Sequence, residues 1–409
     1  MRIRSVTCFV NIDPDSGTQA DTVERAGHLV HQARAALESV GLSVQTTRLA
    51  TQPLSLFSAS PLQVASELWP RCAAAGFEYL SLGPVLADAP GAGASGAGEG
   101  LSRLDLLPDL IRANESVFAG VLVARHGHGV HLEAIRRTAR IVREVAHTTE
   151  LGFGNLQLAM LANVGPHTPF FPAAYHDGGP PALAIATEAA DLAVTAFSEA
   201  GSLREAQTQL VAAIEAAAGQ IVDLVGPLAQ RHDTRFVGID FTLAPFPEEV
   251  RSIGTAVERL GVDRFGAPGT LFVSWFLTDC VRRASYPRCG FNGLMLPVLE
   301  DATLAKRSQE RLFTVNDLLL CSAVCGTGLD TVPLPGDVGE EELAGILLDV
   351  AALALRLDKP LTARLMPIPG ARAGDMTEFD FAYFANGRVL DVKGLGSPGL
   401  FARGEWLAM

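Results

Sequence analysis

The sequence predicts an α/β fold in which helices surround a buried sheet that closes into a barrel. Short apolar runs typical of strands alternate with longer helical patterns from one end of the chain to the other. Apolar strands joined by helices are typical of a sheet that helices cover. About ten helical segments with strands between them favour a closed barrel over an open nucleotide-binding sheet.

The expected elements are apolar runs bounded by glycine, proline or polar residues. The first strand, 3–12, alternates apolar and polar residues after a charged start, which suits an edge or barrel strand better than a signal peptide. The further expected strands are 79–82, 117–123, 156–163, 236–243, 293–298 and 362–367. The expected helices, by their periodicity, are 18–40, 61–75, 101–113, 129–147, 188–199, 203–230, 247–260, 270–284, 314–325 and 339–357.

A glycine- and alanine-rich tract at 89–100 resembles a phosphate-binding loop only at first sight. Its glycines follow no fixed spacing, and no Lys-Ser or Lys-Thr pair closes it. We therefore expect a flexible surface loop. Because the sequence has no internal repeat and no clear linker, residues 1–409 are expected to form one domain, with helix 203–230 protruding between its two halves.

The composition excludes several classes of partner. A net charge of −13 argues against nucleic acid, which needs a concentrated basic face, and against an anionic membrane surface. No run reaches the roughly 18 uninterrupted apolar residues of a membrane helix. Six cysteines without a recognisable secretion signal indicate reduced thiols. We therefore expect a soluble protein of the cytoplasm.

Four blocks in the last two-fifths of the chain place a charged or reactive side chain at the end of an apolar run, beside glycine or proline. They lie at 240–247, 293–301, 325–337 and 359–370. Rigid elements that present polar groups at their tips are how barrels and open sheets build sites. We expect a site where these tips meet.

Acids dominate these blocks. The candidates are Asp240, Glu300, Asp301, Asp330, Asp337, Asp375 and Glu378. Converging carboxylates would repel by about 4 kcal/mol per close pair, so they need a divalent cation, a basic neighbour or raised pKa values. Lys359 and Arg364 could supply the counter-charge or bind a carboxylate or phosphate on a ligand. The alternative is helix capping, as Asp337 could do for helix 339–357.

Cysteine and histidine offer further candidates. Cys325 precedes two glycines, where a sharp turn could present amide groups that activate the thiol or hold an oxyanion; a small buried residue at a helix end is the alternative. His176 is an acid–base candidate, and a structural histidine fits equally well. The run 126–131 holds three histidines, but its spacing favours a strand-to-helix turn over a metal site.

Read in order, the blocks resemble a family of uncharacterised prokaryotic proteins, domain of unknown function 711. The matching segments lie at 240–247, 269–279, 293–301, 324–337 and 359–379. The resemblance is best over 240–404, and the segments 107–111 and 161–176 also resemble the family. The sequence departs from the family after His176, where a Gly-Val-Ser-Gly-Pro-Gly segment is missing.

This resemblance implies a fold similar to that of pyruvate formate-lyase, a ten-stranded α/β barrel, without an established activity. It also implies a partner, a small amino-acid-sensing ACT-domain protein. Asn163 lies in one of the matching segments and becomes a candidate ligand-binding residue on that ground. Glycyl-radical chemistry is not expected, because the tail lacks a glycine loop of the Arg-Val-x-Gly-Tyr type.

We therefore expect an enzyme that acts on a small polar or anionic metabolite inside the barrel. The expected catalytic residues are His176, Cys325, Asp330 and Asp240. The expected ligand-binding residues are Lys359, Arg364, Asp337, Glu378 and Asn163, and a divalent cation would take Glu300, Asp301 and Asp375. The alternative is a non-catalytic sensor that works with an ACT-domain partner. A homo-oligomer fits either hypothesis.

Overall fold

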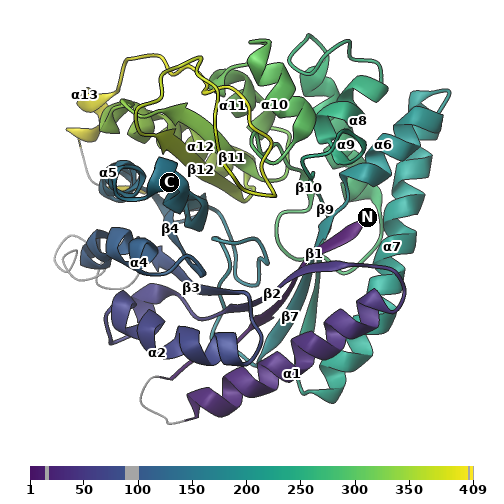
Figure 1. The fold of residues 1–409 in the computed structure, drawn as a ribbon, viewed down its shortest axis with the longest axis vertical. Coiled ribbons are helices and arrows are strands. Elements are labelled where there is room, and N and C mark those ends of the chain that lie inside the picture. The colour runs from purple at the N-terminus through teal and green to yellow at the C-terminus, as the bar shows by residue number, and fades with distance from the viewer. Residues whose placement is uncertain (14–17, 88–100, 404–405, 409) are drawn as a thin grey trace.

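The computed structural model describes residues 1–13, 18–87, 101–403 and 406–408. The tract expected to be a flexible loop, 89–100, lies outside the described residues. The expected α/β class is confirmed: a large sheet of 11 strands occupies the centre, and helices surround it (Figure 1).

The N-terminal half supplies five parallel strands. In spatial order they are β6 (Leu158–Ala162), β4 (Val117–Arg125), β3 (Tyr79–Leu86), β2 (Val44–Ala50) and β1 (Arg2–Phe9). Helices make the crossovers that parallel strands require, and they are α1 (Gln19–Glu38), α2 (Pro61–Ala74), α4 (Leu107–Ala113) and α5 (Leu132–Thr148). Short 3₁₀ segments lie at Leu54–Leu56, Arg103–Leu106 and Glu150–Gln157.

The C-terminal half, taken here from residue 182 onward, adds strands at both ends of this row. β7 (Ala182–Glu188) pairs antiparallel with β1 and parallel with β8 (Arg235–Asp240). At the other end β12 (Leu361–Ile368) pairs antiparallel with β6 and parallel with β11 (Gly328–Pro335). The helices of this half are α6 (Ala190–Glu199), α7 (Leu203–Arg231), α8 (Ile253–Arg259), α9 (Thr270–Arg283), α10 (Ala302–Gln309), α11 (Val315–Ser322), α12 (Glu340–Leu357) and α13 (Pro398–Phe401), with a 3₁₀ turn at Glu249–Arg251.

The two end strands, β8 and β11, are linked only by small pieces of pairing. β9 (Thr242–Leu243) and β10 (Gly293–Leu294) form a separate two-stranded sheet. Single bridges join Ile239 of β8 to Arg288, and Pro297 to Asp330 of β11. The segment 288–298 therefore lies between the two ends of the sheet, but a continuous closed barrel is not formed by these pairs, and a pyruvate formate-lyase-like fold is not shown.

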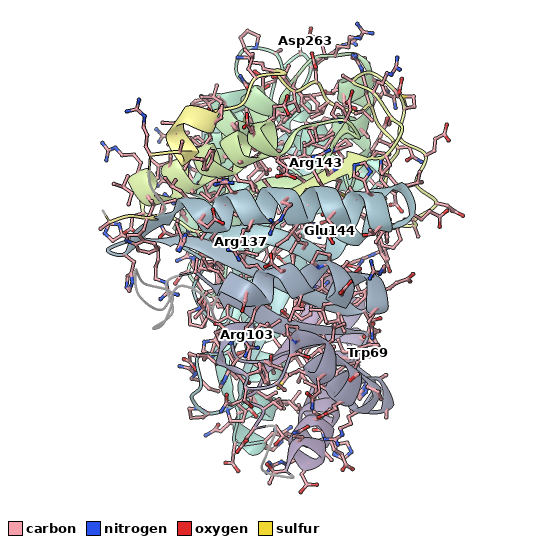
Figure 2. All side chains as sticks on the ribbon, turned by 90° about the vertical axis from the view of Figure 1, so that its left-hand side faces the viewer. Trp69, Arg103, Arg137, Arg143, Glu144 and Asp263 are labelled. Atoms are coloured by element: carbon pink, nitrogen blue, oxygen red, sulfur yellow. The ribbon has the colours of Figure 1, made fainter. Side chains whose placement is uncertain are left out.

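The helices cover the outer side of the sheet with amphipathic faces. On α5, Ile135, Ile141 and Val145 are buried, while Arg137 and Arg143 lie on its outward side (Figure 2). Before it, the histidine run forms a turn and the short strand β5 (Gly129–His131), which pairs with β13 (Trp406–Leu407). The expected strand-to-helix turn is thus present, with positive φ angles at both of its glycines.

Helix α7 is long and apolar enough to cross a membrane by length and composition alone. In the structure it packs along the outside against α1, α6 and α9 instead of protruding between two halves. One residue per turn or so is buried along its length, including Leu210, Ile214 and Ile221. This stripe is the face by which the helix packs against its neighbours.

Candidate functional site

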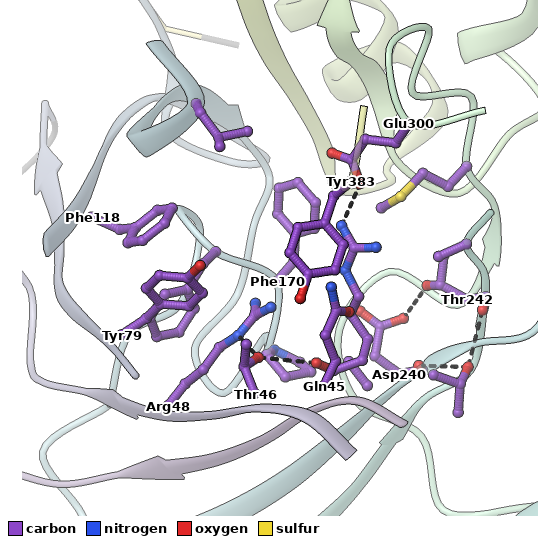
Figure 3. A pocket seen from close by; sticks show the side chains of 18 of the residues that line it. Gln45, Thr46, Arg48, Tyr79, Phe118, Phe170, Asp240, Thr242, Glu300 and Tyr383 are labelled. Atoms are coloured by element: carbon purple, nitrogen blue, oxygen red, sulfur yellow. Dashed lines mark hydrogen bonds and ion pairs between the residues drawn. The ribbon is translucent and has the colours of Figure 1, made fainter. Parts of the chain in front are cut away.

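A cavity of about 80 Å³ lies on the inner side of the sheet, where strands of both halves of the chain meet (Figure 3). Its polar lining comes from β1, β2, β3, β8 and β12, which contribute Arg4, Arg48, Tyr79, Asp240 and Arg364. Alternate residues of a strand face the same side, so Thr46 and Arg48 of β2 both point inward. A single water needs roughly 10–15 Å³, so the cavity has room for several waters or one small molecule.

Aromatic side chains form much of the wall. Phe170 and Phe171 come from the loop between β6 and β7, and Phe381 and Tyr383 come from the segment after β12. Phe118 of β4 packs against Phe171 with ring centroids 5.5 Å apart. The site therefore combines a largely apolar wall with a few polar groups, the usual composition of a small-molecule site.

Two arginines and two acids form a buried ion-pair network beside the cavity. Arg364 donates from Nε to Asp330 Oδ1 at 2.6 Å and from Nη2 to Glu300 Oε1 at 2.9 Å. Arg4 donates to the other oxygen of Glu300. The guanidinium of Arg364 also lies over the ring of Phe170 at 5.2 Å. Because Arg364 and Arg4 each hold their position through carboxylates, both are already neutralised.

The two acids of this network differ in how strongly they hold a proton. Burial raises the pKa of Asp330, and the nearby Glu300 adds to this, although Arg364 opposes it. Burial acts in the same direction on Glu300, but the charges of Arg4 and Arg364 outweigh it and lower its pKa. Within the described residues, Asp330 Oδ2 is buried without a hydrogen-bond partner. Of the two acids, Asp330 is thus the one that protonates more readily.

Arg48 is a cation buried beside the cavity. Its Nε donates to Thr46 Oγ1 at 2.8 Å, and its guanidinium lies over the rings of Tyr79 at 5.7 Å and Phe171 at 5.1 Å. None of the acids in the described part of the chain forms an ion pair with it. The residue is 8% exposed, and burial together with the charge of Arg4 lowers its pKa to about 9. At neutral pH it still carries its positive charge.

Other polar groups around the cavity also have no hydrogen-bond partner among the described residues. Gln45 Oε1 is buried without a hydrogen bond to any described residue. The hydroxyls of Tyr79 and Tyr383 have no hydrogen-bond partner in the ranges that the structure covers. Figure 3 shows the guanidinium of Arg48 pointing into the space between these two tyrosines. Unpaired polar groups that converge on one cavity are typical of a site that binds a polar ligand.

Asp240 lines the cavity from the end of β8 and holds the following turn. Its Oδ1 accepts hydrogen bonds from Thr242 Oγ1 at 2.5 Å and from the backbone N–H of Asn292 at 2.9 Å, and its Oδ2 accepts one from the N–H of Phe291 at 3.0 Å. Burial raises the pKa of Asp240, although these three hydrogen bonds oppose the shift. Oδ2 retains capacity for one more donor.

The structure brings Asp240, Glu300, Asp330 and Arg364 to this site, but not the other expected residues. Cys325 and Lys359 line a different cavity of about 330 Å³ near the end of α11. There Cys325 Sγ accepts a hydrogen bond from the N–H of Gly328 at 3.2 Å. Lys359 Nζ donates to the carbonyls of Ser322 at 3.0 Å, Ala323 at 3.4 Å and Cys325. Lys359 therefore caps the C-terminal end of α11.

His176 and Asn163 make backbone contacts outside the cavity lining. The ring of His176 is fully buried, with Nδ1 accepting from the N–H of Gly178 at 3.1 Å and Nε2 3.0 Å from the carbonyl of Pro180. Burial lowers its pKa. Asn163 accepts from the N–H of His126 and donates to the carbonyl of Ala354 at 2.6 and 2.7 Å. Both side chains fix loops in the structure.

The three expected metal ligands, Glu300, Asp301 and Asp375, do not meet. Glu300 is engaged with arginines, whereas the buried Asp301 accepts five hydrogen bonds, from Ser252, Ile253, Gly254, Thr303 and Leu304. Asp301 thereby caps α8 and α10 at once. Asp375 is exposed and accepts from the N–H of Arg372 at 2.7 Å.

The last two candidates, Asp337 and Glu378, are exposed and apart from the cavity. Helix α12 does not use Asp337 as its cap; Glu342 accepts from the N–H of Gly339 instead. Glu378 lines an outer cleft of about 590 Å³ that is bounded by Phe381, the same ring that borders the inner cavity. Sequence reasoning missed Arg4 and Arg48, whose one signal is an arginine within a buried strand, and Gln45, which has no signal of its own.

Comparisons with known proteins cover both halves of the chain. The model of a family described as uncharacterised ACR (DUF711) matches residues 1–383. The chain is 33% identical over 413 residues to a UPF0210 protein of Pyrobaculum arsenaticum. The aligned region covers 95% of this chain and 89% of that protein. The chain is 30% identical to a UPF0210 protein of Methanopyrus kandleri and 28% identical to one of Desulforudis audaxviator, each over 98% of this chain and 93% of the relative.

Proposed function

Because the chain belongs to the uncharacterised DUF711 family, we propose a function from its own cavity: an enzyme that binds a small anionic metabolite inside the sheet. The observation that supports this most is Arg48, a buried guanidinium beside the cavity without a carboxylate partner among the described residues. The other two arginines that line the cavity, Arg4 and Arg364, form ion pairs with acids. The charge of Arg48 is left for a ligand.

The energetics of burial support an anionic ligand. Removing an ion from water costs several kcal/mol even after the protein relaxes. Contacts of a desolvated cation with aromatic faces return about 2 kcal/mol, so the rings of Tyr79 and Phe171 offset part of that cost. A ligand carboxylate or phosphate could offset the rest through paired, charge-assisted hydrogen bonds from the guanidinium.

The size and lining of the cavity support a ligand of few atoms. Its volume of about 80 Å³ is well below the roughly 300–1,000 Å³ of sites for drug-sized molecules. Gln45 Oε1 could accept a hydrogen bond from the ligand, and the hydroxyls of Tyr79 and Tyr383 could donate or accept. A small carboxylate with a short apolar body fits these groups best.

Asp240 is our candidate for proton transfer. It lines the same cavity as Arg48, its pKa is raised by burial, and one of its oxygens has room for another hydrogen bond. Catalytic acids and bases are commonly carboxyl groups shifted in this direction. The class of reaction proposed is therefore proton transfer to or from a bound anion.

A second candidate function is a sensor that binds the same anion without turning it over. The observation that favours it is the saturation of Glu300, which holds two arginines and is not available as a base. An ACT-domain partner, a homo-oligomeric state and a cytoplasmic location remain predictions for either function. So does closure of the sheet into a pyruvate formate-lyase-like barrel, for which the bridges of segment 288–298 provide support.

The experiment uses untargeted mass spectrometry of a metabolite extract incubated with wild type, Arg48→Met or Asp240→Asn. If the protein is an enzyme, wild type binds an anion from the extract and converts it, so that the amount of this anion falls. Asp240→Asn should bind the anion without converting it, and Arg48→Met should neither bind nor convert it. For a sensor, wild type and Asp240→Asn both retain the anion unchanged. Retention of the same molecules by Arg48→Met and wild type would contradict both functions. Arg136→Met, on the exposed side of α5, is the matched control.

A further inference from the structure

The loop between β6 and β7 is closed at its neck by residues that the cavity does not use. The N–H of His167 donates to the carbonyl of Tyr175 at 2.8 Å, and the N–H of His176 donates to the carbonyl of Thr51 at the end of β2 at 2.8 Å. Between these two points lie the rings of Phe170 and Phe171, which form part of the cavity wall. The neck therefore holds a wall of the candidate site in position.

Three potential metal ligands converge at this neck. A nitrogen of His167, a nitrogen of His176 and a carboxylate oxygen of Asp177 lie within 4.8 Å of one another. His167 Nε2 is 3.5 Å and His176 Nε2 is 3.8 Å from Asp177 Oδ1. These distances exceed the roughly 2.7–3.2 Å of a direct hydrogen bond. They approach the edge of a coordination tetrahedron, roughly 3.3 Å for bonds of about 2.0–2.1 Å.

We propose that His167, His176 and Asp177 bind a zinc ion at the neck of this loop. Two imidazoles and one carboxylate are a donor set that suits zinc, whereas calcium and magnesium prefer oxygen ligands alone. Asp177 is exposed, so the fourth position faces solvent and takes a water. This assignment does not depend on the identity of the ligand in the cavity.

The surroundings suit neutral imidazoles, the form that binds metals. The side chains of His167 and His176 are 8% and 0% exposed, and burial disfavours the charged form of each. The ring of His167 is also held edge-on by Phe9 at 5.3 Å and meets the ring of His176 at 5.3 Å. The two rings are thus fixed in place by packing before any ion arrives.

Arg235 lies beside the proposed zinc site, where its positive charge would repel a cation. Its Nη2 lies 3.5 Å from both ring nitrogens of His167 and 3.6 Å from Asp177 Oδ2. Its side chain is 53% exposed, so it can turn into solvent when zinc binds. In the metal-free protein Arg235 supplies the positive charge that the carboxylate requires.

His176 must change its tautomer on binding. In the present structure its Nδ1 accepts from the N–H of Gly178, so the ring proton is on Nε2, next to the carbonyl of Pro180. Zinc on Nε2 moves this proton to Nδ1 and breaks the contact with Gly178. That residue is exposed and followed by a second glycine, so the turn can yield without disturbing the core.

The test measures zinc binding by the untagged, full-length, metal-free chain in competition with a chromophoric zinc chelator. We expect one zinc per chain. Asp177→Asn and His167→Gln are expected to weaken binding by at least about 10–100-fold, since loss of even a supporting partner has that effect. Arg235→Gln is expected to bind more tightly, by at most roughly 30-fold, because it removes a unit positive charge about 4 Å from a doubly charged ion at a solvated position.

The matched control is His126→Gln, an exposed histidine in the run 126–131. It should bind zinc as wild type does. If His167→Gln fails to fold, the exposed Asp177→Asn carries the same test. The proposal is overturned if wild type takes up no zinc, if Asp177→Asn binds as tightly as wild type, or if His126→Gln is the variant that loses the metal.

Discussion

Arg364 of β12 donates from Nε to Asp330 Oδ1 of β11 at 2.6 Å, with both side chains almost completely removed from solvent. The same guanidinium donates to Glu300, which also receives a bond from Arg4 of β1. A network thus connects β11 and β12, at one end of the sheet, to β1, the third strand from the other end. Buried ion pairs of this kind contribute little net stability when intact, but they become costly when one partner is removed.

Arg364→Met should therefore strongly destabilise the protein. The variant leaves Asp330 without its partner and deprives Glu300 of one of two, so we expect a loss of about 3–5 kcal/mol in the free energy of unfolding, measured by urea denaturation. Arg283→Met is the control, because its pair with Asp279 lies at the surface, is screened by solvent and should contribute little to stability. If both variants lost the same free energy of unfolding, the buried network would stabilise the protein no more than a surface ion pair does.

Lys359→Met should affect stability and leave ligand retention intact. The ammonium group satisfies carbonyls at the end of α11, including those of Ser322 and Cys325, so its loss should cost about 2–3 kcal/mol in thermal or urea unfolding. Lys306→Met, whose side chain is 56% exposed, should change stability by less than about 0.5 kcal/mol. If a folded Lys359→Met protein no longer retained the ligand, Lys359 would have to be counted among the ligand-binding residues after all.

Glu188→Gln should stabilise the protein at neutral pH. Both carboxylate oxygens of Glu188 are buried without a hydrogen bond from the described residues, and the nearest charges, Arg4 and Arg251, lie at 3.7 and 4.0 Å. Burial raises the pKa of Glu188 above its ordinary value of 4.5, against the pull of these arginines. The folded protein therefore prefers the protonated form of this acid more than the unfolded chain does.

The sign of the pH dependence follows from that preference. The contribution of Glu188 to stability is fully present below pH 4.5 and is lost as the pH rises through its folded-state pKa. Glu188→Gln should match wild type near pH 4 and exceed it by about 1 kcal/mol near pH 7 in urea titrations at each pH. Glu24→Gln, on the exposed side of α1, should stay within about 0.5 kcal/mol throughout. A difference in the free energy of unfolding between Glu188→Gln and wild type that shrinks with rising pH would contradict this account.

The sequence predicts the α/β class and most helices, but it conceals several strands, among them β2, β7 and β11. β7 is rich in alanine, which strands generally disfavour, and only its pairing between β1 and β8 makes it extended. β11 contains Pro333 and Pro335, which argue against a strand. The structure tolerates them because β11 ends the main sheet and has one long neighbour, β12.

The candidate site is predictable in part from the charged residues of the four blocks. Asp240 does end its strand, β8, whereas Asp330 and Arg364 come from the same blocks but lie within β11 and β12; all three lie in or beside one cavity. Arg48 escapes because it is part of β2, whose Thr46-Thr47-Arg48 sequence is too polar to suggest a buried strand. Cys325 and Lys359 carry the same local signals as the others, and only the path of the chain separates them from the cavity.

The most direct measurement compares wild type with Arg48→Met for both stability and retention of a small anion. If the guanidinium is kept for a ligand, the variant should unfold at the same or a higher urea concentration, because it loses an unpaired buried charge, and it should retain no anion. Arg48→Lys should recover part of the retention through its charge. A variant that is strongly destabilised yet retains the anion as wild type does would show that Arg48 supports the fold and not a ligand.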